Sequence, residues 1–122
     1  EIVSNSQFIS PNIIKIVNNR EGEVLYCSRS PIPYCKKFSK KIGAKRIFAI
    51  FAFRYYFLKK YNKLEISRLE QIESCGQNRV CDRTKGMYVA PYKYKPSFSV
   101  DTYSDLKLVN KLIVNDPFTR KY

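Results

Sequence analysis

The chain has 122 residues, which is enough for one domain with a modest hydrophobic core and too short for two. Its 23 Lys and Arg residues against 10 Asp and Glu residues give a net charge of +13, which favours anionic partners without selecting among nucleotides, acidic sugars and nucleic acid. Because histidine is absent, Ser-His-Asp catalysis, Cys-His catalysis and His-ligated zinc are excluded.

A β-hairpin is predicted near the start of the chain. The β-branched run at residues 13–17 and the apolar run at residues 23–27 are separated by the turn-forming segment 18–22, which contains Asn and Gly. Pro31 and Pro33 then end regular structure, because each proline removes a backbone donor and fixes φ.

The continuous apolar run at residues 46–53 predicts a strand that is buried on both faces. Residues 54–63 suit a short helix. Ser67 and Glu70 form the spacing of a capping box, which predicts a helix over residues 67–83. That helix would bury one side, which is formed by Leu69, Ile72, Gly76 and Val80.

The last third of the chain predicts one more strand and one more helix. Residues 87–94 alternate as a half-buried strand, and residues 101–105 open a helix with an apolar face. Strands interleaved with helices indicate an α/β or α+β sheet with helical cover. No apolar run reaches the roughly 18–20 residues that span a bilayer, so we expect a soluble cytoplasmic protein with no membrane partner.

The four cysteines, Cys27, Cys35, Cys75 and Cys81, match no CxxC metal or redox spacing. A disulfide framework is not expected for a chain with this cysteine content and no secretion signal. We therefore expect reduced thiols, several of them packed as small apolar groups.

Several segments, in order, resemble one family. They read SPNIIKIV at residues 10–17, LYCSRSPIP at 25–33, IFAFR at 50–54, LEQIE at 69–73 and VDT at 100–102, followed by Asp105-Leu106. This combination resembles the C-terminal half of the 3-deoxy-manno-octulosonate (KDO) cytidylyltransferases, and it covers about residues 11–113.

The resemblance implies a partial Rossmann-like nucleotidyltransferase fold of the nucleotide-diphospho-sugar transferase type, lacking its N-terminal half, with residues 1–122 as one partial domain. Such enzymes transfer CMP from CTP to KDO for lipopolysaccharide biosynthesis and release pyrophosphate. The sugar hydroxyl attacks the α-phosphate, and Mg²⁺ neutralises the developing charge.

The resemblance also implies roles for individual residues. The substrate-binding positions are Arg29, Ser30, Arg54, Gln77 and Arg79. Asp101 matches the aspartate that helps to hold Mg²⁺, at the C-terminal end of a strand. Asp101 is equally well placed to be the N-cap of the final helix.

The sequence departs from the family pattern at several positions. Ile47 and Phe51 stand where the family has a histidine and a tyrosine, and Gly76 is expected inside a helix. Asn78 replaces an apolar residue where a core contact is expected. The family's nucleotide-binding loop and its Gly-Asp-Glu-Pro metal motif are absent from this sequence, so we expect the chain alone to be inactive.

Three hypotheses follow from these departures. In the first, a separate chain carrying the N-terminal half, or a homodimer, completes the site. In the second, the chain is a non-catalytic remnant of the enzyme, and in the third it is a basic module that binds nucleic acid. The last is disfavoured because most aromatics lie in apolar runs that look like core. The positive charge itself is also expected from base-composition drift, which enriches Lys, Asn, Ile, Tyr and Phe together.

Overall fold

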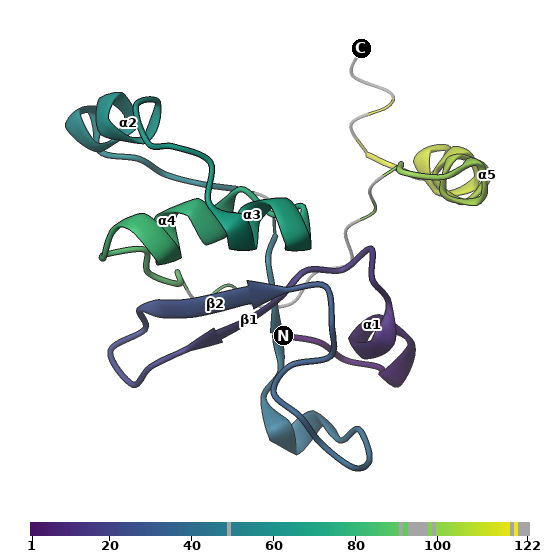
Figure 1. Cartoon of the computed structure of the whole chain (residues 1–122). Helices are drawn as coiled ribbons and strands as arrows, with labels where there is room; N and C mark the ends of the chain where they lie inside the picture. The colour runs from purple at the N-terminus through teal and green to yellow at the C-terminus, as the bar shows by residue number, and fades with distance from the viewer. Residues whose placement is uncertain (49, 91, 93–97, 99, 118, 120–122) are drawn as a thin grey trace. The chain divides into compact units, whose positions relative to one another are not determined.

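The computed structural model describes residues 1–48, 50–90, 92, 98, 100–117 and 119. The chain divides into two compact units, Glu1–Tyr92 and Lys93–Tyr122, and each is described by itself. The first unit contains a small sheet with short helices, and the second contains one helix (Figure 1). The expectation that residues 1–122 form one partial domain stays a prediction.

The predicted hairpin is confirmed. Strand β1 (Lys15–Asn18) pairs antiparallel with β2 (Val24–Ser28), and Ile16 lies opposite Cys27. Gly22, in the connecting turn, has a φ of 85°, which a residue with a Cβ rarely adopts. A third strand, β3 (Lys45–Arg46), pairs antiparallel with β1, so the order across the sheet is β2-β1-β3.

The prediction of a buried strand over residues 46–53 is wrong. Only Lys45–Arg46 forms a strand, although the backbone N–H of Ile47 still donates to Ile14 of the neighbouring segment. Beyond this point the chain leaves the sheet, and Ile50 is 78% exposed. A strand that is buried on both faces needs neighbours on both, and here, among the described residues, the ring of Phe53 contacts only the rings of Phe57 and Tyr61 on the following helix while Phe51 stays exposed.

Of the helical segments in the described chain, the first lies before β1, the second between β2 and β3, and the third after β3. Helix α1 (Asn5–Ile9) is capped by the Ser4 side chain, and a short 3₁₀ helix, η1 (Lys40–Ile42), lies in the basic connector. Helix α2 (Tyr55–Tyr61) confirms the helix predicted within residues 54–63.

The single helix predicted over residues 67–83 is instead two helices, α3 (Arg68–Glu73) and α4 (Gln77–Arg83). Ser74 adopts a left-handed conformation with a φ of 45° and ends α3, while Gly76 is the N-cap of α4 and not an interior residue. Ser67 accepts a hydrogen bond from the Glu70 backbone, so half of the predicted capping box forms.

The predicted apolar side of this region is only partly buried. Val80 is buried on α4, whereas Leu69 and Ile72 on α3 are exposed. Helix α4 packs against β2, and Figure 1 shows it alongside that strand. Asn78 on α4 is fully buried, and its side-chain amide donates to the Cys27 carbonyl at 2.9 Å and accepts from the Cys27 N–H at 3.1 Å.

Two apolar clusters form the core of the first unit. The larger cluster contains Ile16, Val24, Cys27 and Cys75, with Ile14, Ile47, Cys81, Met87 and Val89 packed against it. The smaller cluster contains Ile2, Phe8 and Ala44, with Cys35, Phe38 and Ile42 packed against it. All four cysteines are free thiols packed in or against these clusters, which confirms that prediction.

The predicted strand over residues 87–94 is reduced to an isolated bridge between Tyr88 and Glu23, and residues 91, 93 and 94 lie outside the described part. In the second unit, α5 (Tyr103–Ile113) confirms the final helix. Its N-cap is Thr102, which forms a capping box with Asp105, so the alternative that Asp101 caps this helix is wrong. In the described part of the chain, no helix is both long enough and apolar enough to cross a bilayer.

Candidate functional site

The loop after β2 is fixed to the end of α3 by the Glu73 carboxylate. Glu73 Oε1 accepts from the Tyr26 hydroxyl at 2.6 Å and from the Ser28 hydroxyl at 2.7 Å. Glu73 Oε2 accepts from the Arg29 backbone N–H at 2.8 Å. One carboxylate therefore fixes both the last residues of the strand and the first residue of the loop.

The charge state of Glu73 follows from these contacts. Burial raises the pKa of Glu73, but the hydrogen bonds from Tyr26, Arg29 and Ser28 outweigh burial and hold that pKa below its ordinary value. The same contact raises the pKa of Tyr26, because its hydroxyl donates to a carboxylate. Glu73 is thus an ionised acceptor and Tyr26 a neutral donor at neutral pH.

The guanidinium of Arg29 binds main-chain carbonyls. Its Nε donates to the Glu73 carbonyl at 2.8 Å, Nη1 to the Pro11 carbonyl at 2.8 Å, and Nη2 to the Ser74 carbonyl at 3.1 Å. Two of these carbonyls belong to the C-terminal end of α3, where helix carbonyls lack partners. Two of the five N–H donors of a guanidinium remain available for a ligand.

Lys15 also holds the loop that follows β2. Its side chain is fully buried, and Nζ donates to the Ser10 carbonyl at 2.8 Å, to the Ile13 carbonyl at 2.7 Å and to the Arg29 carbonyl. Burial lowers the pKa of Lys15, while the charge of Glu73 raises it. A buried ammonium needs such partners, and here every one of them is a carbonyl of the chain.

Sequence reasoning missed Lys15, Tyr26 and Glu73. A signal was present for two of them: Lys15 interrupts a β-branched run, and Glu73 ends the LEQIE segment. A charged residue within an apolar strand is almost never buried unless it is paired. That rule predicts that Lys15, if buried, has hydrogen-bond partners, but it does not predict which groups they are.

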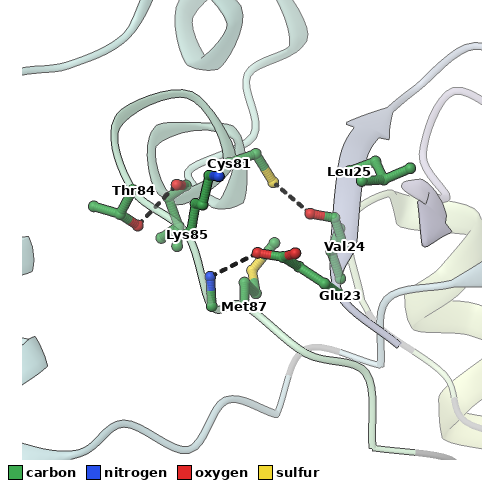
Figure 2. Close-up of a pocket in the computed structure, with 9 residues that line it drawn as sticks. Glu23, Val24, Leu25, Cys81, Thr84, Lys85 and Met87 are labelled. Atoms are coloured by element: carbon green, nitrogen blue, oxygen red, sulfur yellow. Dashed lines mark hydrogen bonds between the residues drawn. The ribbon is translucent and has the colours of Figure 1, made fainter. Parts of the chain in front are cut away.

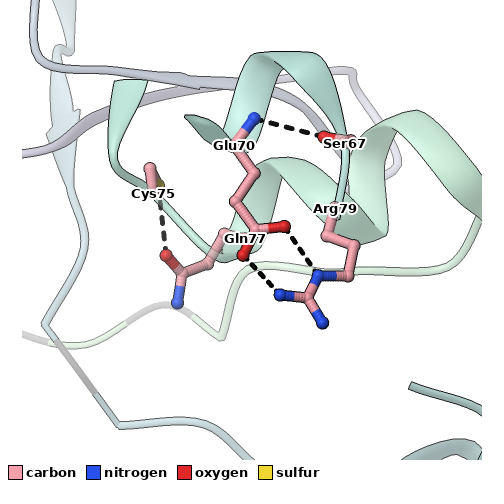
Figure 3. A network of polar contacts seen from close by, with 5 residues as sticks. All are labelled: Ser67, Glu70, Cys75, Gln77 and Arg79. Atoms are coloured by element: carbon pink, nitrogen blue, oxygen red, sulfur yellow. Dashed lines mark hydrogen bonds and ion pairs between the residues drawn. The ribbon is translucent and has the colours of Figure 1, made fainter. Parts of the chain in front are cut away.

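A second polar group joins α3 to α4 (Figure 3). Arg79 binds Glu70 with two bonds of 2.6 Å, one from Nε and one from Nη2, and its guanidinium carbon lies 5.0 Å from the centre of the Tyr61 ring. Hydrogen bonding to Arg79 lowers the pKa of Glu70. Gln77 Oε1 accepts from the Cys75 thiol at 3.1 Å. Gln77 and Arg79 thus make contacts within the fold.

The remaining two substrate candidates in the first unit are exposed. Ser30 lies in the loop, and its backbone N–H donates to the Ser28 hydroxyl at 3.0 Å. Arg54 is the exposed N-cap residue of α2 and makes no side-chain capping bond. The structure thus brings Arg29 and Ser30 together on one loop and Gln77 and Arg79 together on α4, with Arg54 on neither.

Asp101, the candidate metal ligand, is exposed in the second unit. Its backbone N–H donates to Asp105 Oδ2 at 3.3 Å. The expected strand before Asp101 is not present at Val100, and residue 99 lies outside the described part. Among the described residues, no group of three or more Cys, Asp or Glu side chains is placed to hold a metal ion.

The chain belongs to the cytidylyltransferase family, whose model matches residues 1–87. The fold is therefore of the nucleotidyltransferase class, and the partial α/β fold expected from the sequence is confirmed.

Within that family the chain is similar to the 3-deoxy-manno-octulosonate cytidylyltransferases. It is 35% identical to the enzyme of Nitrosococcus oceani, over 93% of this chain and 47% of that protein. It is 36% identical to the enzyme of Thermodesulfovibrio yellowstonii, over 92% of this chain and 46% of that protein. The resemblance stated from the sequence is confirmed.

A solved structure agrees with these relatives. The chain matches CMP:2-keto-3-deoxy-manno-octonic acid synthetase complexed with CTP, with a TM-score of 0.66 and 31% identity. The match covers 92% of this chain and 46% of that one. The chain therefore spans about half the length of the relatives it matches.

Proposed function

We propose that this chain contributes part of the active site of a KDO cytidylyltransferase, which transfers CMP from CTP to KDO in the cytoplasm and releases pyrophosphate, for lipopolysaccharide biosynthesis. The observation that carries the proposal is the anchored loop after β2. The Glu73 carboxylate, the Arg29 guanidinium and the Lys15 ammonium fix this loop. It leaves Ser30 exposed in a chain that belongs to the cytidylyltransferase family.

The chemistry needs positioned cations and donors more than it needs a covalent group. When the KDO hydroxyl attacks the α-phosphate of CTP, negative charge develops on the phosphate oxygens, and fixed donors stabilise it. In this proposal the Ser30 hydroxyl and the two spare N–H groups of Arg29 bind the acidic sugar. Arg54, exposed and without a capping bond, supplies a further cation.

Gln77 and Arg79 are proposed to act differently. Arg79 is held by Glu70, and Gln77 accepts from a buried thiol. Their contribution to substrate binding is therefore to keep the start of α4 in place beside the loop. Any direct contact with substrate is made by the N–H groups of Gln77 and Arg79 that these bonds do not use.

The other half of the site is proposed to come from a second polypeptide. The relatives are about twice as long as this chain. The apolar side chains of Ile50, Phe51 and Phe53 are exposed next to Arg54. We propose that a separate chain carrying the remaining part of the enzyme, or a second copy of this chain, covers them.

A Mg²⁺ ion is expected from the family, but the described residues do not form a site for it by themselves. Mg²⁺ binds oxygen ligands in octahedral geometry, and Asp101 offers a single carboxylate. Its proposed role is one ligand, the others coming from the substrate phosphates, water and the second polypeptide. No step proposed for the residues of this chain depends on the ion.

Pyrophosphate release tests the proposal. The chain is incubated with CTP, KDO and Mg²⁺, alone and with a polypeptide carrying the other half of a relative. We expect release only from the mixture. Arg54→Ala should reduce that release, whereas Arg20→Ala, which removes an exposed arginine from the hairpin turn, should not. Failure of every mixing ratio to release pyrophosphate would contradict a composite active site.

A binding measurement separates an active component from a non-catalytic remnant. A ligand that binds only the folded chain raises its melting temperature. We expect CTP to stabilise the mixture of the two polypeptides, and KDO to raise the melting temperature further. No shift with either ligand would favour the remnant.

Single-stranded nucleic acid is a second candidate ligand, favoured by the surface of α2. Tyr55 and Tyr56 are exposed, and Lys59 Nζ lies 4.5 Å from the centre of the Tyr55 ring. The expectation that most aromatics are buried is therefore wrong at this helix. Exposed rings and cations together can stack bases and bind phosphates. Oligonucleotide binding that weakens steeply with salt would support this candidate, and no binding at low salt would exclude it.

A further inference from the structure

Three of the four cysteines meet in the larger core cluster although they come from different segments. Cys27 lies on β2, Cys75 lies in the turn between α3 and α4, and Cys81 lies on α4. Cys35 lies apart from them, against the smaller cluster. The contact of α4 with β2 therefore brings thiols from distant parts of the sequence into one cluster.

The thiols of this cluster influence one another. Hydrogen bonding to Cys75 and Cys81 raises the pKa of Cys27, so the fully buried Cys27 keeps its proton. The same bonding from Cys27 lowers the pKa of Cys81 and lowers that of Cys75 to about 7. Cys27 thus keeps its proton, whereas the pKa values of its two neighbours lie below the ordinary thiol value.

A pocket gives access to one of these thiols. It has a volume of about 290 Å³ and is lined by residues of β2, α4 and the segment that follows α4, Cys81 among them (Figure 2). Cys81 is half-buried, whereas Cys75 is 2% exposed and does not line the pocket. A small molecule that enters the pocket therefore meets Cys81 first.

The Cys81 side chain also points toward β2. Its Sγ lies 3.8 Å from the Val24 carbonyl oxygen, and Figure 2 shows the sulfur directed at that strand. Cys75 instead donates to Gln77 at 3.1 Å. The thiol that can be reached from the pocket is thus the one that faces the strand carrying Cys27.

We propose that Cys81 is an oxidation site for hydrogen peroxide and that Cys27 is its disulfide partner. The Cys81 sulfur attacks the O–O bond: an S–O bond forms, the O–O bond breaks, and the second oxygen leaves as water. The Cys27 sulfur then attacks the sulfenic sulfur: an S–S bond forms, the S–O bond breaks, and a second water leaves. Two thiols lose two electrons and two protons, and the peroxide gains them.

Peptide mapping of the full 122-residue chain tests this proposal. The reduced chain is treated with hydrogen peroxide, its remaining thiols are alkylated, and the digest is read by mass spectrometry. We expect alkylatable thiols to fall from four to two and a peptide pair linked through Cys27 and Cys81 to appear. A Cys27–Cys75 link as the main product would overturn the proposal, and so would Cys81 that stays reduced or is over-oxidised without a link.

Two controls tie the result to the folded geometry. Cys35→Ser removes a thiol that is also half-buried but lies outside the cluster, and it should leave the Cys27–Cys81 link unchanged. Cys81→Ser should abolish the link. Because a loss of the link in that variant could also come from poor folding, the unmodified chain is also oxidised in urea. We expect the preference for the Cys27–Cys81 pair to disappear there, and an identical product mixture in native buffer and in urea would overturn the proposal.

Discussion

Removing the side-chain amide of Asn78 should destabilise the first unit more than any other single polar truncation on α4. Asn78 is 0% exposed, and its amide bonds both the N–H and the carbonyl of Cys27. β2 is the outer strand of the sheet, and at Cys27 both backbone groups face away from β1, as every second residue of an edge strand does. In Asn78→Ala both groups lose their partners while they remain buried.

The magnitude follows from counting those groups. A buried donor or acceptor left without a partner costs about 1–3 kcal/mol, so the two groups of Cys27 together cost about 2–6 kcal/mol. The whole folding free energy of a small domain is about 5–15 kcal/mol, so the variant should lose a large fraction of its stability.

Urea unfolding followed by circular dichroism measures this loss. The matched control is Asn110→Ala, which truncates an exposed asparagine within helix α5 and should change the free energy of unfolding by less than about 0.5 kcal/mol. If Asn78→Ala were as stable as Asn110→Ala, the amide of Asn78 would not be a structural bridge between α4 and β2, and the reasoning would be refuted.

Three further predictions concern the helix ends and ion pairs. Ser74→Gly should stabilise the chain by about 1 kcal/mol, because glycine adopts a positive φ without strain, and Ser74→Ala should give no such gain in urea unfolding. Arg79→Lys should lower the urea midpoint more than Arg83→Lys does, because only Arg79 forms a bidentate pair; equal effects would contradict this. The lowered pKa of Glu73 implies that its stabilising contribution is full above its ordinary value of 4.5 and is lost as pH falls through its folded-state pKa. Glu73→Gln should therefore be less stable at pH 7 and lose less stability on acidification, as urea midpoints at several pH values would show; the same acid loss in both chains would contradict it.

Local patterns predicted the hairpin, helices α2 and α5 and the start of α3. Two short apolar runs and a glycine turn fix β1 and β2 through contacts between neighbouring segments, and the capping residue Ser67 marks where α3 begins. Such features depend on a few adjacent residues, so the sequence alone carries them.

The prediction of a strand over residues 46–53 was wrong for a different reason. An apolar run of strand length indicates burial, but burial requires neighbours that the run itself does not specify. After Arg46 the chain finds no pairing partner among the described strands, and Ile50 is exposed. The break between α3 and α4 was similarly missed, because the capping box predicts a start and the left-handed Ser74 is visible only in the backbone.

The sequence pointed to Arg29 and Ser30 but not to the residues that hold their loop in place. The family resemblance pointed to Arg29, yet its guanidinium is bonded to three carbonyls. The partners that hold it in place, Glu73 and the segment around Pro11, are distant in sequence. Contacts of that kind depend on tertiary packing, which neither residue spacing nor composition encodes.

The outer edge of β2 has a consequence for how this sheet can extend. Along that edge the N–H of Val24 donates to Met87, the main chain of Cys27 is bonded to Asn78, and the N–H of Arg29 donates to Glu73. Because these backbone groups already have hydrogen-bond partners, another strand finds few groups to pair with along this edge. Growth of the sheet beyond β2, whether by a second polypeptide or by another copy, is thereby disfavoured.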